Sequence, residues 1–213
     1  MPTESHLIDA MEKIKRRGGW YRCSFEKGGP LDIDQDMLIR HELHVGKTLS
    51  GKMYDTLKRE SETAHARESA LRLLSYRARS RKELIKRLRG KGFQMSIVDS
   101  VMNGLKEKGL VDDEEFAKLF VSDLIRRRPA GTFLIKSELQ KKGIEGPVIE
   151  RIIEDTFRKH DPVELAGECA RQWLKRHAKT PEPERRKKLS HYLYQRGFSW
   201  TIIEDVLGDS SAF

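Results

Sequence analysis

One pattern of six residues occurs three times in this chain, in the same order and at constant spacing within each copy. It consists of two apolar residues four positions apart, a glycine four positions later, an apolar residue directly after it, and two more apolar residues at intervals of four. The copies are Leu84, Leu88, Gly92, Phe93, Ile97, Val101; Ile135, Leu139, Gly143, Ile144, Val148, Ile152; and Leu189, Leu193, Gly197, Phe198, Ile202, Val206. All six positions shift by 51 residues from the first copy to the second and by 54 from the second to the third. Such self-similarity predicts an array of repeated structural units.

The spacing predicts three helices in each unit. Apolar residues four apart lie on one helix face, and the glycine can end that helix in the left-handed conformation. The stripe after the glycine predicts a second helix, and an upstream stripe predicts a third. That upstream stripe is Ala66, Ala70, Leu73, Leu74 in the first copy, Ala117, Val121, Leu124, Ile125 in the second, and Ala170, Trp173, Leu174 with a one-residue slip in the third. We therefore expect a mainly all-α chain with three-helix repeats over residues 61–110, 111–160 and 161–208.

The first 60 residues follow a different pattern and are expected to form an N-terminal extension. Alternation over residues 20–25, a Gly-Gly-Pro break at 28–30 and a short apolar run at 31–33 predict a β-hairpin. A helix is expected near residues 35–42, and Ser50 is expected to cap a long helix that enters the first repeat. Residues 1–18 and 209–213 are expected to be loose ends.

Positive charge is concentrated in one segment. The chain has 213 residues and a formal net charge of +9, and residues 61–110 carry 12 basic against 5 acidic side chains, a net of +7. The first candidate binding group is Arg77, Arg79, Arg81, Lys82, Lys86, Arg87 and Arg89, and the second is Arg126, Arg127 and Arg128, in the turn before Pro129. Such runs attract phosphates or an acidic protein surface, although a solvated helix face without a partner has the same composition.

The composition also excludes several classes of protein. No stretch approaches the ~18 consecutive apolar residues of a membrane-spanning helix, and the N-terminus lacks the apolar segment of a secretory signal. Cys23 and Cys169 are the two cysteines, which are too few and too distant for a disulfide scaffold or a cysteine zinc site. We therefore expect a cytoplasmic protein with no metal and no cofactor.

Three motifs suggest chemistry, and each has a better structural explanation. Gly46-Lys47-Thr48 matches the end of a phosphate-binding loop, but the first glycine of that pattern would fall at His41. His41 and His44 lack a third metal ligand at suitable spacing. The acidic residues 112–115 fit the start of a helix, where negative charge opposes the positive end of the helix dipole. No catalytic group of residues supports an enzyme.

Four aromatic residues near the C-terminus are candidates for stacking on nucleic-acid bases. Trp173 follows an apolar stripe and is expected to pack in the core. Trp200 is expected to act as a hydrophobic staple at the start of the last helix. For Tyr192 and Tyr194 the pattern favours neither role.

Several short segments occur in the order and spacing of a known family. They include residues 70–93 of the first repeat, the acidic start at 110–117, the Arg-Pro-Ala-Gly turn at 128–131 and the Lys-Gly-Ile turn at 142–144. Together they resemble the RecX family of bacterial regulators over about residues 66–207. The third repeat departs most, because its connection at 180–188 is longer and rich in proline and charge.

The resemblance implies tandem three-helix repeats in an elongated curved array and a non-enzymatic modulator of the recombinase RecA. Members of the family bind the RecA filament on single-stranded DNA and suppress its ATP hydrolysis, strand exchange and co-protease activity, and some also bind DNA. We therefore expect the RecA filament as partner, single-stranded DNA reached directly or through the filament, and a monomeric regulator.

A nonspecific DNA-binding module of tandem helix-turn-helix-like units is the alternative. The short glycine turn between two helices is common to both hypotheses. However, residues 94–101 and 199–206 contain no Lys or Arg, whereas a recognition helix normally offers such side chains to base edges. Base-specific recognition is therefore not expected, and nonspecific binding would weaken steeply with salt.

Overall fold

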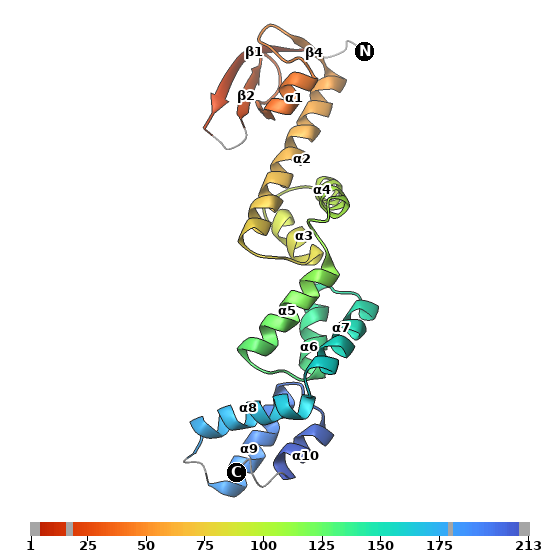
Figure 1. The fold of residues 1–213 in the computed structure, drawn as a ribbon. Coiled ribbons are helices and arrows are strands. Elements are labelled where there is room, and N and C mark those ends of the chain that lie inside the picture. The colour runs from red at the N-terminus through yellow and green to blue at the C-terminus, as the bar shows by residue number, and fades with distance from the viewer. Residues whose placement is uncertain (1–4, 16–18, 179–180, 209–213) are drawn as a thin grey trace. The chain divides into compact units, whose positions relative to one another are not determined.

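The computed structural model describes residues 5–15, 19–178 and 181–208, and confirms a mainly helical fold with a small N-terminal sheet (Figure 1). The strands are β1 (Ser5–Ile14), β2 (Trp20–Phe25), β3 (Leu31–Asp34) and β4 (Thr48–Ser50). The helices are α1 (Gln35–Arg40), α2 (Gly51–Tyr76), α3 (Arg81–Arg89), α4 (Met95–Glu107), α5 (Asp113–Arg127), α6 (Thr132–Lys142), α7 (Gly146–Lys159), α8 (Pro162–Arg176), α9 (Glu182–Gln195) and α10 (Trp200–Gly208). The chain divides into two units, Met1–Arg77 with Leu84–Leu110, and Ala78–Glu83 with Val111–Phe213.

The N-terminal sheet is antiparallel, with strand order β3-β2-β1-β4. The predicted hairpin is confirmed, because β2 pairs with β3 in a register that joins Trp20 to Asp34 and Cys23 to Leu31. The predicted loose end is wrong over Ser5–Ile14, which forms the inner strand β1 and pairs with both β2 and β4. The rest of that predicted end (1–4 and 16–18) and residues 209–213 lie outside the described residues.

Helix α2 is fastened to this sheet by polar contacts from its first half. Its start at Ser50 is confirmed, since the N–H of Met53 donates to Ser50 Oγ. Tyr54 donates its hydroxyl to the Gly29 carbonyl at 2.7 Å, and Ser61 donates to the Asp32 carbonyl at 2.5 Å. These bonds hold the helix against the predicted hairpin.

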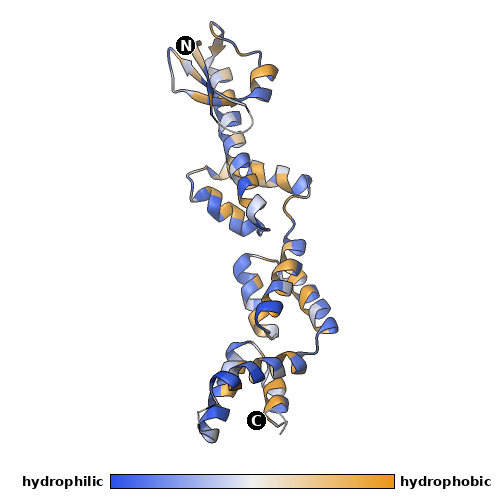
Figure 2. Cartoon of the chain, turned by 60° about the vertical axis from the view of Figure 1, so that its left-hand side comes forward, coloured by the Kyte–Doolittle hydropathy of each residue, from blue (hydrophilic) through white to orange (hydrophobic). Residues whose placement is uncertain are grey.

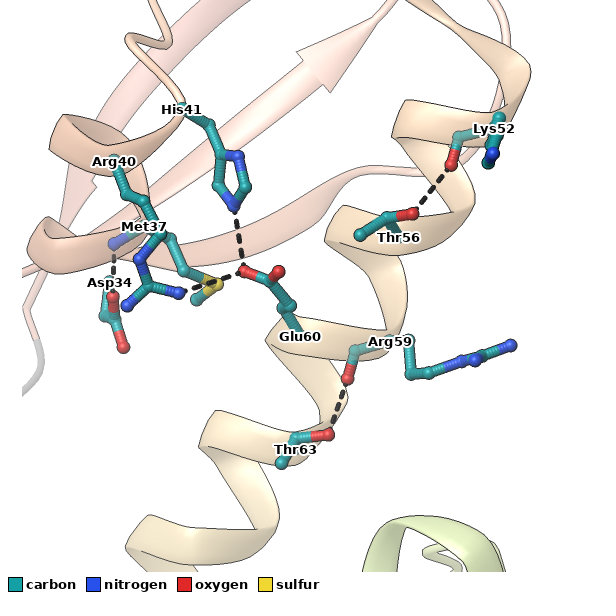
Figure 3. Close-up of polar contacts among 9 residues, drawn as sticks. All are labelled: Asp34, Met37, Arg40, His41, Lys52, Thr56, Arg59, Glu60 and Thr63. Carbon is teal, nitrogen blue, oxygen red and sulfur yellow. Dashed lines mark hydrogen bonds and ion pairs between the residues drawn. The ribbon is translucent and has the colours of Figure 1, made fainter. Parts of the chain in front are cut away.

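Glu60 ties α2 to the end of α1 (Figure 3). Its Oε2 lies 2.9 Å from His41 Nε2 and 3.5 Å from Arg40 Nη1. His41, considered above as a possible metal ligand, is thus occupied by a structural contact.

The second half of α2 belongs to the first repeat. Leu57 is buried in the core of the sheet, whereas Ala66 and Ala70 are buried further along the same helix, which also packs on α4. The predicted boundary between residues 60 and 61 therefore falls inside one continuous helix. Leu84 of α3 and Met102 of α4 are fully buried in the same unit, and hydrophobic and hydrophilic residues alternate along the helices (Figure 2).

The second and third repeats share one hydrophobic core in the second unit. It includes Val121 and Leu139 from the second repeat and Cys169, Leu193 and Ile203 from the third. A common core explains why these two repeats form a single unit, because each repeat alone has too few apolar residues to enclose a core of its own.

One loop-to-turn contact occurs twice in the second unit, at equivalent positions of the repeat. Ser80 Oγ donates to the Lys142 carbonyl at 2.7 Å. Gly131 stands 51 residues after Ser80, and Arg196 stands 54 residues after Lys142. In this second copy of the contact, Gly131 N donates to the Arg196 carbonyl at 2.9 Å. The sequence repeat is therefore also a repeat of tertiary contacts.

A glycine directly follows Lys142 and Arg196, the two residues whose carbonyls accept these bonds. These glycines allow the two chain segments to approach each other closely. Gly143 has φ of +82° and Gly197 has φ of +84°, which confirms the predicted left-handed helix ends. A Cβ on Gly197 would lie 2.2 Å from the backbone N of Leu134, so no side chain fits there unless the backbone moves.

Candidate functional site

Helix α3 carries the densest part of the basic run. Leu84 and Leu88 bury its inner face, whereas Lys86, Arg87 and Arg89 are exposed in its last turn. Cations at a helix C-terminus are stabilised by the helix dipole. The helix therefore presents three positive side chains to solvent without a cost to its own stability.

The first turn of α3 has structural partners instead. The N–H of Glu83 donates to Ser80 Oγ at 3.2 Å, so Ser80 caps the helix. The N–H of Arg81 donates to Asp113 Oδ1 at 2.7 Å, and the stem of Lys82 lies against Gly143. Burial raises the pKa of the Asp113 carboxyl, and the bond from Arg81 opposes that shift.

The residues just before α3 differ in exposure. Arg77 is exposed at the end of α2, whereas Arg79 is half-buried. Five of the seven residues of the first candidate group are thus exposed, and one of these five, Lys82, also has a structural role, as does the half-buried Arg81. Lys86, Arg87 and Arg89 are the members that are best placed to contact a partner.

The second candidate group divides in the same way. Arg126 Nη2 lies 2.6 Å and Arg127 Nη2 3.8 Å from the carboxylate of Asp123, and both arginines are exposed. Arg128 Nε donates to the Tyr192 hydroxyl at 3.2 Å, and its guanidinium lies 5.4 Å from the centre of the Tyr192 ring. Arg128 therefore links the second repeat to the third.

Arg126 also borders a groove between α5 and α7, with a volume of about 450 Å³. The floor of the groove is apolar, with Val121, Ile125 and Ile152. Its rim includes Lys118, Arg126, Lys159, His160 and one carboxylate, Asp155. The rim is thus mainly cationic, although Lys118 pairs with Glu114 at 3.1 Å.

The acidic start of α5 acts as a helix cap, as predicted. The N–H groups of Glu114 and Glu115 donate to Asp112 Oδ1 at 2.8 and 3.0 Å. Hydrogen bonds from Lys118 and Arg151 lower the pKa of Glu114. These carboxylates are therefore engaged by backbone amides and cations rather than facing an open site.

The Gly46-Lys47-Thr48 motif lacks the surroundings of a phosphate-binding loop. Lys47 Nζ donates to the carbonyls of His41 and Glu42, and strand β4 follows the motif where a helix would be required. Lys47 therefore closes a turn.

The aromatic residues near the C-terminus separate into buried and exposed pairs. Trp173 is 8% exposed and stacks on His177, as predicted for a core residue, and Tyr192 is half-buried. The expected staple role of Trp200 is wrong, because its side chain is 56% exposed and stacks on Tyr194, which is 51% exposed. For Tyr192 and Tyr194 the sequence pattern favoured neither role, and the structure shows Tyr192 as half-buried and Tyr194 as exposed.

Two further features bear on the class of protein. Over residues 5–15, 19–178 and 181–208, no helix is both long and apolar enough to cross a lipid bilayer, and no three His, Cys, Asp or Glu side chains gather in a metal-binding arrangement. Burial raises the pKa of Cys23 to about 11 and also raises that of Cys169. Both thiols are therefore protonated near neutral pH.

Three family models match the three repeats. They describe RecX, first three-helix domain, over residues 66–113, RecX, second three-helix domain, over residues 112–152, and RecX, third three-helix domain, over residues 161–207. Together they cover more than half of the chain.

Named relatives agree with these models. The chain is 36% identical to the regulatory protein RecX of Chlorobium limicola over 141 residues, 65% of this chain and 84% of the relative. It is 30% identical to that of Geobacillus sp. over 175 residues, 82% of this chain but only 64% of the relative. The chain therefore spans about two thirds of the Geobacillus protein.

Solved structures also resemble the chain. A crystal structure of regulatory protein RecX superposes with a TM-score of 0.74 at 25% identity, covering 96% of this chain and all of the other. The crystal structure of RecX from Lactobacillus salivarius gives a TM-score of 0.58, also at 25% identity, covering 71% of this chain and 98% of the other.

Proposed function

The chain belongs to the RecX family of regulatory proteins, and on this premise we propose that it regulates the recombinase RecA by binding RecA filaments on single-stranded DNA. In this proposal it acts in the cytoplasm, as a monomer and by binding alone. Its effect is to restrain ATP hydrolysis, strand exchange and co-protease activity of the filament.

The exposed cations on the last turn of α3 are the observation that best supports this mechanism. Lys86, Arg87 and Arg89 project from a helix whose opposite face is fixed by Leu84 and Leu88. A cationic surface on a rigid helix attracts the phosphates of a nucleoprotein filament or an acidic face of its protein. Arg126 and Arg127 on α5 provide a second cationic surface in the following repeat.

Repetition of the helical units supports a repeating partner. The glycine turns at Gly92, Gly143 and Gly197 have the same left-handed geometry. Tandem units of one design can present similar surfaces, which suits a filament built from identical subunits.

We test this proposal with ATP hydrolysis by preformed RecA filaments on single-stranded DNA, with the protein titrated in at fixed salt. We expect half-inhibition well below one protein per recombinase, because simple competition for DNA must cover most of the strand. An absence of inhibition at excess protein would reject the proposal and favour the alternative, a nonspecific DNA-binding module.

A triple substitution tests the role of α3. Lys86→Gln, Arg87→Gln and Arg89→Gln remove three exposed charges without placing acids at the helix C-terminus. At roughly 0.5 kcal/mol for each lost contact, the concentration for half-inhibition should rise about tenfold. The matched control is Lys52→Gln, Lys58→Gln and Arg59→Gln, which removes the same charge from exposed positions on α2.

The two triple variants separate a local from a general charge effect. If α3 contacts the filament, only its variant loses inhibition, while circular dichroism shows unchanged helix content for both. Equal losses in the two variants would mean that net charge alone matters and would reject α3 as the contact surface.

A further inference from the structure

Two exposed aromatic side chains stack on each other in the third repeat. Tyr194 at the end of α9 and Trp200 at the start of α10 have ring centres 5.4 Å apart and ring planes 22° apart. Both are more than half exposed. A third exposed aromatic residue, Phe133, lies in the first turn of α6, and its backbone N–H donates to the carbonyl of Gly197, which lies between Tyr194 and Trp200 in the sequence. The turn that separates the stacked rings is therefore fixed to α6.

The stretch of sequence that leads up to this pair is strongly basic, whereas two exposed acids, Glu204 and Asp205, follow Trp200 on α10. Residues 171–196 carry nine basic side chains, Arg171, Lys175, Arg176, Lys179, Arg185, Arg186, Lys187, Lys188 and Arg196, against two acidic ones, Glu182 and Glu184. The resulting net charge of +7 equals that of residues 61–110. It is hidden when residues 161–213 are counted together, because acidic residues on both sides reduce the total to +1.

Helix α9 brings the charge and the aromatic pair to one face. Leu189 and Leu193 bury its inner side, whereas Lys187, His191 and Tyr194 are exposed. Lys187 and Tyr194 are seven residues apart, so they lie on the same side of the helix about 10 Å from each other. A single-stranded nucleic acid that has a phosphate near Lys187 can therefore place one of its bases on the rings of Tyr194 and Trp200.

Packing at a helix end is the simplest alternative explanation for the pair. It accounts poorly for Trp200, because a tryptophan recruited to stabilise a helix end gains most by burying its large apolar surface. Trp20 and Trp173, by contrast, are only 4% and 8% exposed. Exposed aromatic rings beside a cationic helix face are the combination that binds single-stranded nucleic acid, since bases stack on the rings and cations hold the phosphates.

We propose that Tyr194 and Trp200 form a stacking platform for unpaired bases, with the exposed cations of α9 binding the adjacent phosphates. The ligand class is single-stranded nucleic acid, and its choice rests on the proposed function, in which single-stranded DNA is already a partner. The inference deepens that function by naming the residues of the third repeat that bind this ligand directly.

The test uses the full chain and a labelled oligothymidine of about 15 nucleotides, without recombinase. Binding is measured by fluorescence anisotropy at several salt concentrations. The double variant Tyr194→Ala and Trp200→Ala should weaken binding at least tenfold while leaving its salt dependence unchanged, because no charge is removed. Tyr76→Ala is the matched control, since it removes an aromatic ring that is 78% exposed on α2, and it should bind as the parent protein does.

Two further probes distinguish stacking from charge attraction. An abasic strand with the same number of phosphates should bind at least tenfold more weakly than oligothymidine, and tryptophan fluorescence should be quenched by oligothymidine in the parent protein but not in Trp200→Phe. Equal binding of the abasic strand, equal binding of the double variant, or unchanged tryptophan emission would each overturn the proposal.

A protein ligand for the same rings gives a different result. If the double variant loses inhibition of RecA filaments but binds oligothymidine as before, the platform contacts an apolar side chain of a protein, and the inference is wrong. Because oligonucleotide binding is measured without recombinase, a failure here leaves the proposed regulation of RecA intact.

Discussion

Gly197 occupies a position where two chain segments approach too closely for a side chain. Its φ is +84°, and a Cβ there would lie 2.2 Å from the backbone N of Leu134. Gly92 has the same left-handed backbone in the first repeat, with φ of +92°, but no heavy atom lies within 4 Å of its Cβ position. One sequence pattern thus serves two purposes, a helix end at Gly92 and both a helix end and a tertiary contact at Gly197.

Alanine substitutions separate these purposes. Gly92→Ala should cost about 1 kcal/mol of unfolding free energy, because only the backbone conformation is unfavourable. Gly197→Ala should cost about 3 kcal/mol or more, because the Leu134 backbone must also move. Chemical denaturation followed by circular dichroism measures both values, and equal costs would contradict the close approach.

At the scale of single elements, α3 depends on a residue that precedes it. Ser80 is fully buried, accepts the N–H of Glu83 and donates to the Lys142 carbonyl. One hydroxyl therefore both caps the helix and joins it to a turn 62 residues away. Lys142 adds an ion pair with Glu83 at 2.7 Å.

Ser80→Ala should destabilise the second unit by about 2 kcal/mol. About half comes from the lost cap and the rest from the unpaired carbonyl of Lys142. The matched control is Ser75→Ala on α2, where the exposed hydroxyl donates only to the nearby Arg72 carbonyl, and its cost should stay below about 0.5 kcal/mol. Thermal or chemical denaturation compares the two, and a small effect at Ser80 would show that its bonds are replaced by water.

At the scale of the whole molecule, the chain contains separate hydrophobic cores. Leu57 belongs to the core of the N-terminal sheet, and Leu193 belongs to the core shared by the second and third repeats. Both side chains are fully buried. Because each core is closed within its own unit, each unit should respond to its own mutations.

Leu57→Ala and Leu193→Ala should each cost about 2–5 kcal/mol, but in different parts of the chain. Hydrogen exchange followed by mass spectrometry should show faster exchange over the first unit for Leu57→Ala and over α5–α10 for Leu193→Ala. Acceleration over the whole chain by either variant would indicate one cooperative unit.

The repeat pattern predicted most of the helical fold because its signals are local. Apolar residues four apart define a helix face, and glycine defines a left-handed end, within a few positions of one another. The cap at Ser50 and the acidic helix start at Asp112 were predicted for the same reason and are confirmed. Strand β1 was missed because it depends on pairing with β2 and β4, up to about 45 residues away, which its own sequence does not reveal.

The candidate surfaces were only partly visible in the sequence. The charge of residues 77–91 and of 126–128 was clear, but the sequence did not show that Arg128 contacts Tyr192, 64 residues away, while Arg126 pairs with Asp123 on its own helix. Likewise, Trp200 was expected to pack at the start of the last helix, but its side chain is 56% exposed. By itself the sequence determined the family, the repeats, the helix ends and the concentration of charge, because these depend on neighbours along the chain. Only the tertiary structure decided which cations and rings remain exposed, because that depends on contacts between residues that are distant in sequence.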